Sequence, residues 1–336
     1  MKSISKIIIL IFSCLSVYFH YHNNVSSEIQ KLIYDDLYNG QFRESSTERF
    51  NVLNMDYPNL TLSSLPIKGM IARYFFLGAR YDEALELLNE SMNVNPYIMY
   101  NESLKQDIYF ALGVKDSILY YAEKTFTGIP NNHKHFIDLA RAYRNFDRFY
   151  LIDSIFKKVE KTKVPAIWKF YFASQLAQED SISDYAREKA KESISFFGKK
   201  DPNLRLAAVY VLYGTDQIDK SIQADEEASE LFSQERYREA GIKYAEAAKL
   251  NPIEYSHFEN AAISNFKFGY DEQAIPFLKH VIDSLNPKSG KSEFVLAQIY
   301  EKLGDYENAC KYVSLSSRQD YNEAYRFLGE YCRDRD

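Results

Sequence analysis

The segment Ser289-Gly290-Lys291-Ser292 has the residue types of a loop that cradles a phosphate group. Such a loop needs a glycine five residues before Gly290, and Leu285 occupies that position. A phosphate loop also follows a strand, whereas both flanks of this segment are expected to be helical. The segment is therefore predicted to be a turn between two helical units.

Two further groups of polar residues could bind a metal ion or transfer protons. His133 and His135 stand two residues apart, so their side chains diverge on a helix, and no third ligand is evident. Asp225, Glu226 and Glu227 form an acidic cluster, which on a helix is more often solvated surface than an acid and base pair. We predict no metal site in either place.

Motifs that mark common catalytic sites do not occur in the sequence. It contains no G-x-S-x-G, no H-E-x-x-H and no glycine-rich dinucleotide loop. The sequence accordingly predicts a protein that is not an enzyme, with no catalytic residue and no cofactor.

The three cysteines, Cys14, Cys310 and Cys332, are too few for a disulfide-built scaffold, and none forms a C-x-x-C pair. If the C-terminal segment folds back as a helix on the helix before it, the turn falls near Tyr321, midway between Cys310 and Cys332. The two sulfur atoms would then lie level. A disulfide and two buried thiols both fit this arrangement.

Residues 1–25 are predicted to be a signal anchor or a signal peptide. Lys2 and Lys6 precede the apolar run from Ile7 to Phe19, IIILIFSCLSVYF. Thirteen residues at about 1.5 Å each fall short of a hydrocarbon core of roughly 30 Å, so an uncleaved anchor competes with a cleaved signal. The absence of a clear small-x-small cleavage site favours the anchor.

Lipidation is an alternative for the same segment. Ile11-Phe12-Ser13-Cys14 resembles a bacterial lipobox with Cys14 as the lipidated residue, although Phe12 is bulky and the residues after Cys14 stay apolar. A cleaved, secreted form or a buried helix is a third alternative. For an anchor or a lipoprotein, the positive N-terminal flank predicts that the rest of the chain lies outside the cytoplasm, in the cell envelope or periplasm.

The composition is that of a folded protein with no affinity for nucleic acid. Hydrophobic residues make up 46% of the chain and charged residues 26%, with a formal net charge of -6. Lys and Arg are scattered among Asp and Glu, so no basic stripe could neutralise a phosphate backbone. The 28 Tyr and 23 Phe are expected to act mostly as wedges between helices.

A period of about 34 residues runs through the sequence. An anchor position recurs at Ala84, Ile118, Ile152 and Ala186, and again at Ala240, Ala274 and Ala309. A small residue stands 12 positions before the anchor, an aromatic 3 before it, and a proline 12 or 13 after it. The small residues are Ala72, Ala140, Ala228, Ala262 and Ala297; the aromatics are Phe42, Tyr81, Phe149, Tyr237 and Tyr306; the prolines are Pro58, Pro96, Pro130, Pro165, Pro252 and Pro287.

This order of small residue, aromatic and proline resembles the tetratricopeptide repeat (TPR) family, over roughly Ser26 to Asp336. The last three units match best, and Ile118 and Ile152 depart from the family pattern by replacing a small residue. The resemblance implies an all-α fold, a right-handed superhelical solenoid of antiparallel helix pairs. An N-terminal hydrophobic helix would precede it.

The repeat spacing predicts the domain organisation. About five helix pairs occupy 26–200, an extra helix and a joint occupy 201–220, three helix pairs occupy 221–320, and a capping helix occupies 321–336. The joint is predicted because Ala186 and Ala240 are 54 residues apart instead of 34. Within it, Asp201 to Gly214 is expected to be an unpaired helix.

The TPR resemblance implies a binding groove lined by the first helices of successive units. The residues predicted to line it are Arg73, Phe76, Tyr100, Phe110, Arg141, Arg144, Trp168 and Tyr171. Arg141 and Arg144 lie on one face among aromatics, which suits an extended peptide with carboxylates.

The sequence therefore predicts a membrane-tethered scaffold or adaptor that binds a partner protein or peptide. The alternative is a carbohydrate-binding or polysaccharide-processing accessory protein of the envelope. It is motivated by the surplus of Tyr and by Trp168, because aromatic rings stack on sugars.

Overall fold

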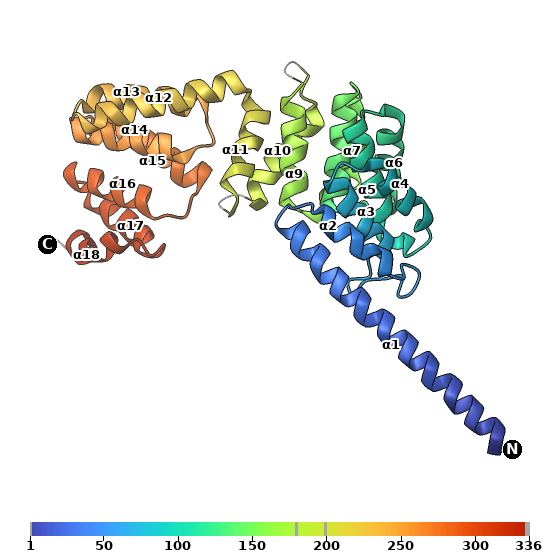
Figure 1. Ribbon diagram of the computed structural model, residues 1–336. Helices are drawn as coiled ribbons and strands as arrows, with labels where there is room; N and C mark the ends of the chain where they lie inside the picture. The colour runs from blue at the N-terminus through green and yellow to red at the C-terminus, as the bar shows by residue number, and fades with distance from the viewer. Residues whose placement is uncertain (1, 179–180, 198–199, 333–336) are drawn as a thin grey trace. The chain divides into compact units, whose positions relative to one another are not determined.

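The structure, a computed structural model, describes residues 2–178, 181–197 and 200–332. Eighteen α-helices and several short 3-10 or π turns make up the regular structure of these residues, with no strand among them (Figure 1). The predicted all-α fold is confirmed. The chain divides into two compact units, Met1–Gln178 and Glu179–Asp336.

The first unit holds α1 to α9. Their bounds are α1 Lys2–Tyr38, α2 Glu44–Thr47, α3 Ile67–Leu77, α4 Tyr81–Glu90, α5 Tyr100–Leu112, α6 Lys115–Gly128, α7 His133–Asn145, α8 Ile152–Lys157 and α9 Pro165–Leu176. The helices α3 and α4 form a packed pair, as do α5 and α6, while α7 packs against α8 and α9.

The second unit holds α10 to α18. Their bounds are α10 Asp184–Phe197, α11 Pro202–Tyr213, α12 Thr215–Ser233, α13 Tyr237–Leu250, α14 Tyr255–Phe268, α15 Asp271–His280, α16 Lys291–Lys302, α17 Tyr306–Ser317 and α18 Asn322–Tyr331. The pairs are α10 with α11, α12 with α13, α14 with α15, and α16 with α17, and α18 packs on α17.

The periodic positions of the sequence form the cores of these pairs. The anchor residues from Ala84 to Ala309 are all buried, and the small residues 12 positions earlier have no exposed surface. Small side chains at these points let the two helices of a pair approach closely, and any larger side chain would push them apart. The register read from the sequence is therefore the packing register of the fold.

The C-terminal half of α1 is part of the first unit. Ile29 and Ile33 are buried in a core shared with α3 and α4. The buried carboxylate of Asp36 accepts a hydrogen bond of 2.8 Å from the Tyr74 hydroxyl of α3 and lies 3.3 Å from the Arg43 guanidinium. A paired carboxylate in a core fixes the position of its helix.

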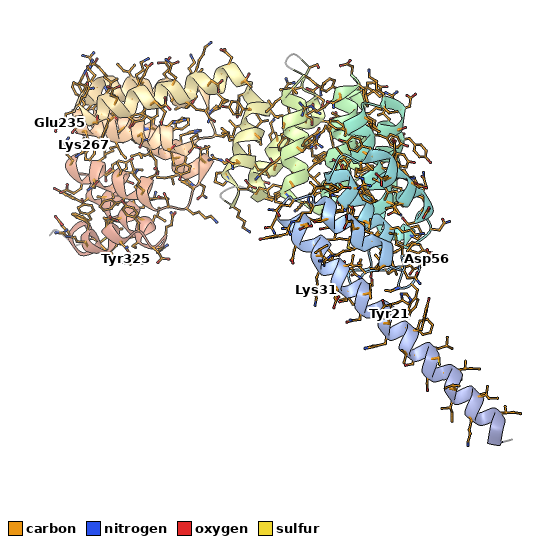
Figure 2. The ribbon with its side chains drawn as sticks, in the orientation of Figure 1. Tyr21, Lys31, Asp56, Glu235, Lys267 and Tyr325 are labelled. Atoms are coloured by element: carbon orange, nitrogen blue, oxygen red, sulfur yellow. A yellow bond between two sulfur atoms is a disulfide. The ribbon has the colours of Figure 1, made fainter. Side chains whose placement is uncertain are left out.

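The N-terminal half of α1 has no comparable neighbours. Its contact with the rest of the unit begins at Tyr18, whose hydroxyl accepts a 3.3 Å hydrogen bond from Asn54, and Phe19, whose ring lies 4.7 Å from that of Tyr57. Before Tyr18, apolar side chains project on every side of the helix (Figure 2). Among the described residues, no helix is long and apolar enough to cross a membrane.

Two expectations about helix boundaries are wrong. The N-terminal segment and the first helix of the array were expected to separate near residue 25, but α1 runs unbroken, because no Gly or Pro interrupts the sequence before Gly40. The helix at Asp201–Gly214 was expected to be unpaired; it is present as α11 and packs against α10 and α12. The remaining boundaries stay a prediction.

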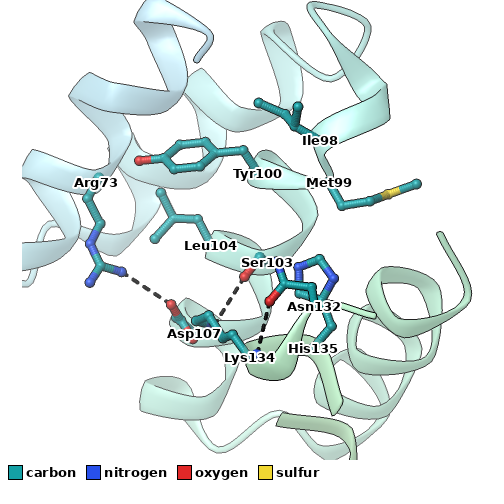
Figure 3. A pocket seen from close by; sticks show the side chains of 10 residues that line it. All are labelled: Arg73, Ile98, Met99, Tyr100, Ser103, Leu104, Asp107, Asn132, Lys134 and His135. Carbon is teal, nitrogen blue, oxygen red and sulfur yellow. Dashed lines mark hydrogen bonds and ion pairs between the residues drawn. The ribbon is translucent and has the colours of Figure 1, made fainter. Parts of the chain in front are cut away.

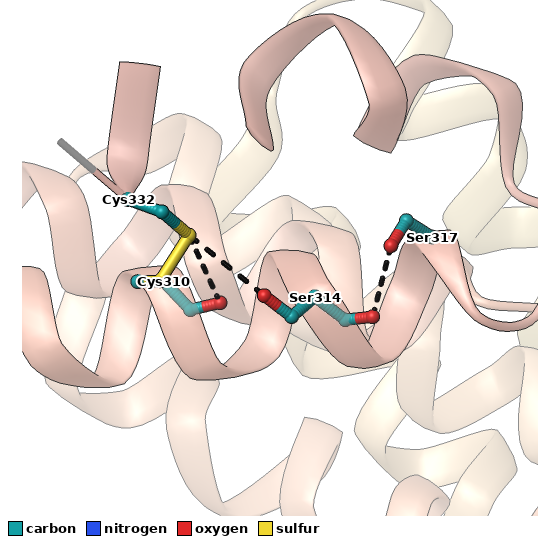
Figure 4. Close-up of a disulfide and its surroundings, with 4 residues drawn as sticks. All are labelled: Cys310, Ser314, Ser317 and Cys332. Carbon is teal, nitrogen blue, oxygen red and sulfur yellow. Dashed lines mark hydrogen bonds between the residues drawn. A yellow bond between two sulfur atoms is a disulfide. The ribbon is translucent and has the colours of Figure 1, made fainter. Parts of the chain in front are cut away.

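The C-terminal helix α18 folds back on α17, and a disulfide joins Cys310 to Cys332 (Figure 4). The two Cα atoms are 4.7 Å apart. Ala324 and Tyr331 of α18 are buried against the last helix pair, so the helix covers an apolar face that a solenoid end would otherwise expose. Residues 333–336 of the predicted cap lie outside the described residues.

Removing this disulfide should destabilise the second unit. Because the bond closes a loop of 22 residues, its loss through Cys310→Ser with Cys332→Ser should lower the free energy of unfolding by about 3 kcal/mol. In a Cys14→Ser background, intact mass spectrometry should show a gain of two hydrogen atoms on reduction. An unchanged mass, or a double variant as stable as the oxidised chain, would contradict the bond.

Candidate functional site

The first helices of three successive pairs, α3, α5 and α7, carry charged residues at one register position. Arg73, Asp107 and Arg141 follow one another at 34 residues. The Arg73 Nη1 donates to Asp107 Oδ2 at 3.2 Å, and the Arg141 Nη1 donates to Asp138 Oδ1, one turn away on α7, at 3.2 Å. The repeat thus places a row of charges across three helices of the first unit.

A cavity of about 270 Å³ opens along this row (Figure 3). Its lining comes from α3, α5, α7 and the loops before α5 and α7: Arg73, Ile98, Met99, Tyr100, Ser103, Leu104, Asp107, Asn132, Lys134 and His135. The Lys134 ammonium spans it, with Nζ 3.1 Å from both Ser103 Oγ and Asp107 Oδ1, and it also pairs with Asp138.

A second cavity of about 330 Å³ shares Arg73 and Asp107 with the first. Its other lining residues are Phe76, Gln106, Phe110, Ala111, Ile118, Asp138, Arg141 and Ala142. Because the two cavities share a wall and follow the same helices, they form one continuous groove. We call the two parts the first and the second cavity.

Positive charge exceeds negative charge in this groove. Its lining has three cations, Arg73, Lys134 and Arg141, and two carboxylates, Asp107 and Asp138, a net charge of +1. The Asp138 side chain is 7% exposed, whereas the three cationic side chains are 43% to 49% exposed. The carboxylates therefore hold the cations in place, and N–H groups of the cations remain free for a ligand.

Burial keeps two titratable groups of the first cavity uncharged near neutral pH. Burial, partly opposed by the Arg73 charge, raises the pKa of Tyr100 to about 12, so its phenol keeps its proton. Burial also lowers the pKa of His135 below its usual value. His135 Nδ1 lies 3.3 Å from the Ile129 carbonyl oxygen, which can only accept, so Nδ1 carries the proton of the neutral ring.

The structure brings together five of the eight residues predicted to line the groove: Arg73, Phe76, Tyr100, Phe110 and Arg141. Arg144 lies one turn after Arg141, and both guanidinium carbons lie 5.9 Å from the Phe170 ring centre. Asp107, Lys134 and Gln106 are groove residues that the sequence reasoning missed. Adding or subtracting 34 from Arg73 and Tyr100 would have found Asp107 and Lys134.

Trp168 and Tyr171 do not line the groove, which corrects the expectation. They are 1% and 0% exposed, and the Tyr171 ring stacks on Phe156 of α8 at 3.8 Å between ring centres. The reason lies in α9, which is apolar around most of its circumference and packs against both α7 and α8. These rings serve as core.

The motifs that the sequence reasoning rejected lie apart from the groove or in its wall. His133 is exposed and His135 is buried, so their rings share no site. Gly290 has a φ of 74° and is the residue before the first turn of α16, as expected of a turn between helices. Lys291 lies 3.6 Å from the Glu259 carboxylate.

Ser221, His257 and Asp225 of the second unit have the order of a hydrolase triad. His257 Nε2 lies 3.3 Å from Ser221 Oγ, and its Nδ1 lies 2.8 Å from Asp225 Oδ1. Ser221, however, has no exposed surface, and its hydroxyl donates to the Ala247 carbonyl at 2.9 Å. No substrate reaches such a hydroxyl, so the three residues act as a strut between α12, α13 and α14.

A 34-residue register of antiparallel helix pairs, with small residues at their contacts, is now established in both units. The chain has the tetratricopeptide-repeat fold. Its groove lies on the first helices of the TPR pairs of the first unit, where the sequence reasoning expected it.

Comparisons with known proteins agree with the TPR fold and go no further. No protein-family model matches the chain, and no curated protein does. Among solved structures, a tetratricopeptide repeat protein from Parabacteroides merdae matches at 12% identity over 92% of this chain and 100% of that chain, with a TM-score of 0.35. The TPR2AB domain of yeast Sti1, in complex with pHSP90, matches at 16% identity over 79% and 95%, with a TM-score of 0.32.

Proposed function

We propose that this TPR protein is a non-catalytic interaction scaffold whose first unit binds an extended peptide segment bearing carboxylates. The observation that carries the proposal is the continuous groove of two cavities over α3, α5 and α7. Its length along three helices suits an extended chain, and its net positive charge suits acidic side chains.

Arg73 and Arg141 are the residues proposed to bind the peptide carboxylates. Each uses one guanidinium nitrogen on an aspartate, at 3.2 Å, and each is nearly half exposed. A guanidinium has five N–H donors, so enough remain for a bidentate contact with a carboxylate. Asp107 and Asp138 keep the two forks oriented before the peptide arrives.

We also propose that the N-terminal half of α1 holds the protein at a membrane. Its apolar side chains are exposed on all sides, as in the consecutive residues Ile7 to Phe12, which are 47% to 69% exposed. Large exposed apolar surfaces mark membrane or protein interaction sites. Cys14 is exposed and free, so a lipid on this residue is a second form of the same tether.

The array is proposed to lie outside the cytoplasm, in the cell envelope. The disulfide between Cys310 and Cys332 supports this location, because such bonds persist in oxidising compartments and are rare in the cytosol. The carbohydrate-binding alternative loses its main support, since Trp168 is buried in the core and offers no ring to a sugar.

Peptide binding through the groove should depend on Arg141. We expect peptides with two glutamates to bind in fluorescence anisotropy, and the same peptides with glutamine to bind about tenfold more weakly or worse, because charge-assisted hydrogen bonds contribute about 1.5–3 kcal/mol each. Arg141→Ala should weaken binding by a similar factor, and the affinity for glutamate peptides should fall with added salt.

Arg187→Ala provides a matched control for this experiment. Arg187 is 48% exposed and pairs with Asp184 three residues before it at 3.3 Å, as Arg141 pairs with Asp138, but it lies in the second unit. It should leave peptide affinity unchanged. Equal binding of glutamate and glutamine peptides, or an equal loss in both arginine variants, would contradict the proposal.

The membrane tether should be lost when charge enters the exposed turns of α1. Full-length protein should float with vesicles of phosphatidylcholine and phosphatidylglycerol in a density gradient, and Ile9→Asp with Phe12→Asp should abolish flotation. Tyr38→Asp is the control, because Tyr38 is 92% exposed at the other end of the same helix. Wild-type protein that stays at the bottom of the gradient would refute the tether.

A further inference from the structure

Gln106 breaks the small-residue rule of the array. It stands 12 positions before the anchor Ile118, where the other pairs of the first unit have Ala72, Ala140 and Ser174. Those three residues have no exposed surface and fill tight contacts between helices. In the pair α5 and α6, both the small position and the anchor position are enlarged, to Gln106 and Ile118.

The second cavity lies at this enlarged contact. Gln106 and Ile118 both line it, and both are buried, at 5% and 4% exposure. Larger side chains at a helix contact hold the helices further apart, which accounts for a cavity at this pair. The substitution of two small residues has therefore created space at the base of the groove.

The Gln106 amide is the polar group of this cavity whose hydrogen-bonding capacity is unused. Its Oε1 is buried and has no hydrogen-bond partner. Buried amides in proteins are almost always hydrogen-bonded, because an unpartnered one is destabilising. An unsatisfied amide in the wall of a binding groove marks a place where a ligand supplies the missing partner.

The remaining walls define what the ligand must look like. Phe76 and Phe110 supply aromatic rings, and Ala111, Ala142 and Ile118 complete an apolar surface. Arg73 lies over the Phe76 ring at 5.3 Å, and Arg141 lies on α7 across the cavity. The complement of these walls is a flat apolar group that ends in a neutral polar group, next to a carboxylate.

We propose that the second cavity receives a tyrosine side chain of the bound peptide, next to one of its acidic residues. This inference rests on the proposed function and names the specificity of the same groove. The tyrosine ring packs against Phe76 and Phe110, and its hydroxyl hydrogen-bonds with the Gln106 amide. An amide can turn either its oxygen or its NH₂ group inward, and a phenol both donates and accepts, so the pair is satisfied in either orientation.

Other side chains fit the cavity less well. Phenylalanine would fill the same space and leave the Gln106 amide without a partner. A phosphorylated tyrosine would bring about two negative charges to a neutral amide among apolar side chains, whereas Arg73 and Arg141 already serve the neighbouring carboxylate. Alanine would leave the cavity empty. Unmodified tyrosine is the residue that meets every wall.

The test compares three peptides, Ser-Glu-Tyr-Glu-Ser with capped ends and the same peptide with Phe or Ala at its centre, on the full-length chain. The wild-type protein should bind the Tyr peptide about three- to tenfold more tightly than the Phe peptide, the worth of one neutral hydrogen bond, and the Ala peptide most weakly. Gln106→Met keeps the side-chain volume and removes the amide, so it should bind the Tyr and Phe peptides equally well.

Two further readings keep the outcome clear. Circular dichroism and the fluorescence of Trp168, the single tryptophan, should show that Gln106→Met is folded. Equal wild-type affinity for the Tyr and Phe peptides, or discrimination that survives in Gln106→Met, overturns the tyrosine inference while peptide binding stands. If the wild-type chain binds none of the three peptides nor any other glutamate peptide, both the inference and the proposed function are overturned.

Discussion

The close approach of two helices at fully buried small side chains is the constraint on which the rest of the structure depends. Where Ala72 or Ala140 lies in such a contact, the pair has one register and one separation. Repeating the contact at intervals of 34 residues places equivalent positions of successive first helices side by side. The row of Arg73, Asp107 and Arg141 is a consequence of that repetition.

The groove uses both obedience to the rule and a departure from it. The regular positions supply the charged row, in which buried Asp138 orients Arg141 and Lys134. The irregular positions Gln106 and Ile118 supply the second cavity and a polar group without a partner. A binding site in a repeat protein is expected where one unit differs from the others, because identical units offer identical surfaces.

Sequence periodicity predicted the helix pairs, their phase and most of the groove, because small residues and prolines constrain the backbone locally. It could not predict that Trp168 and Tyr171 are core, since their exposure depends on how closely α8 covers α9. The continuity of α1 was missed because a change from apolar to polar composition was taken as a boundary. The partners of Arg73 and Arg141 were within reach of the same register and were overlooked.

The most direct test of the small-residue constraint enlarges one contact and watches the unit that contains it. Ala140→Leu places a large side chain at a fully buried position of α7, and Ala173→Leu makes the same change at an exposed position of α9. Urea unfolding followed by the fluorescence of Trp168 reports on the first unit. The account predicts that Ala140→Leu lowers the free energy of unfolding by about 1–3 kcal/mol and that Ala173→Leu leaves it nearly unchanged. Equal effects of the two substitutions would contradict it.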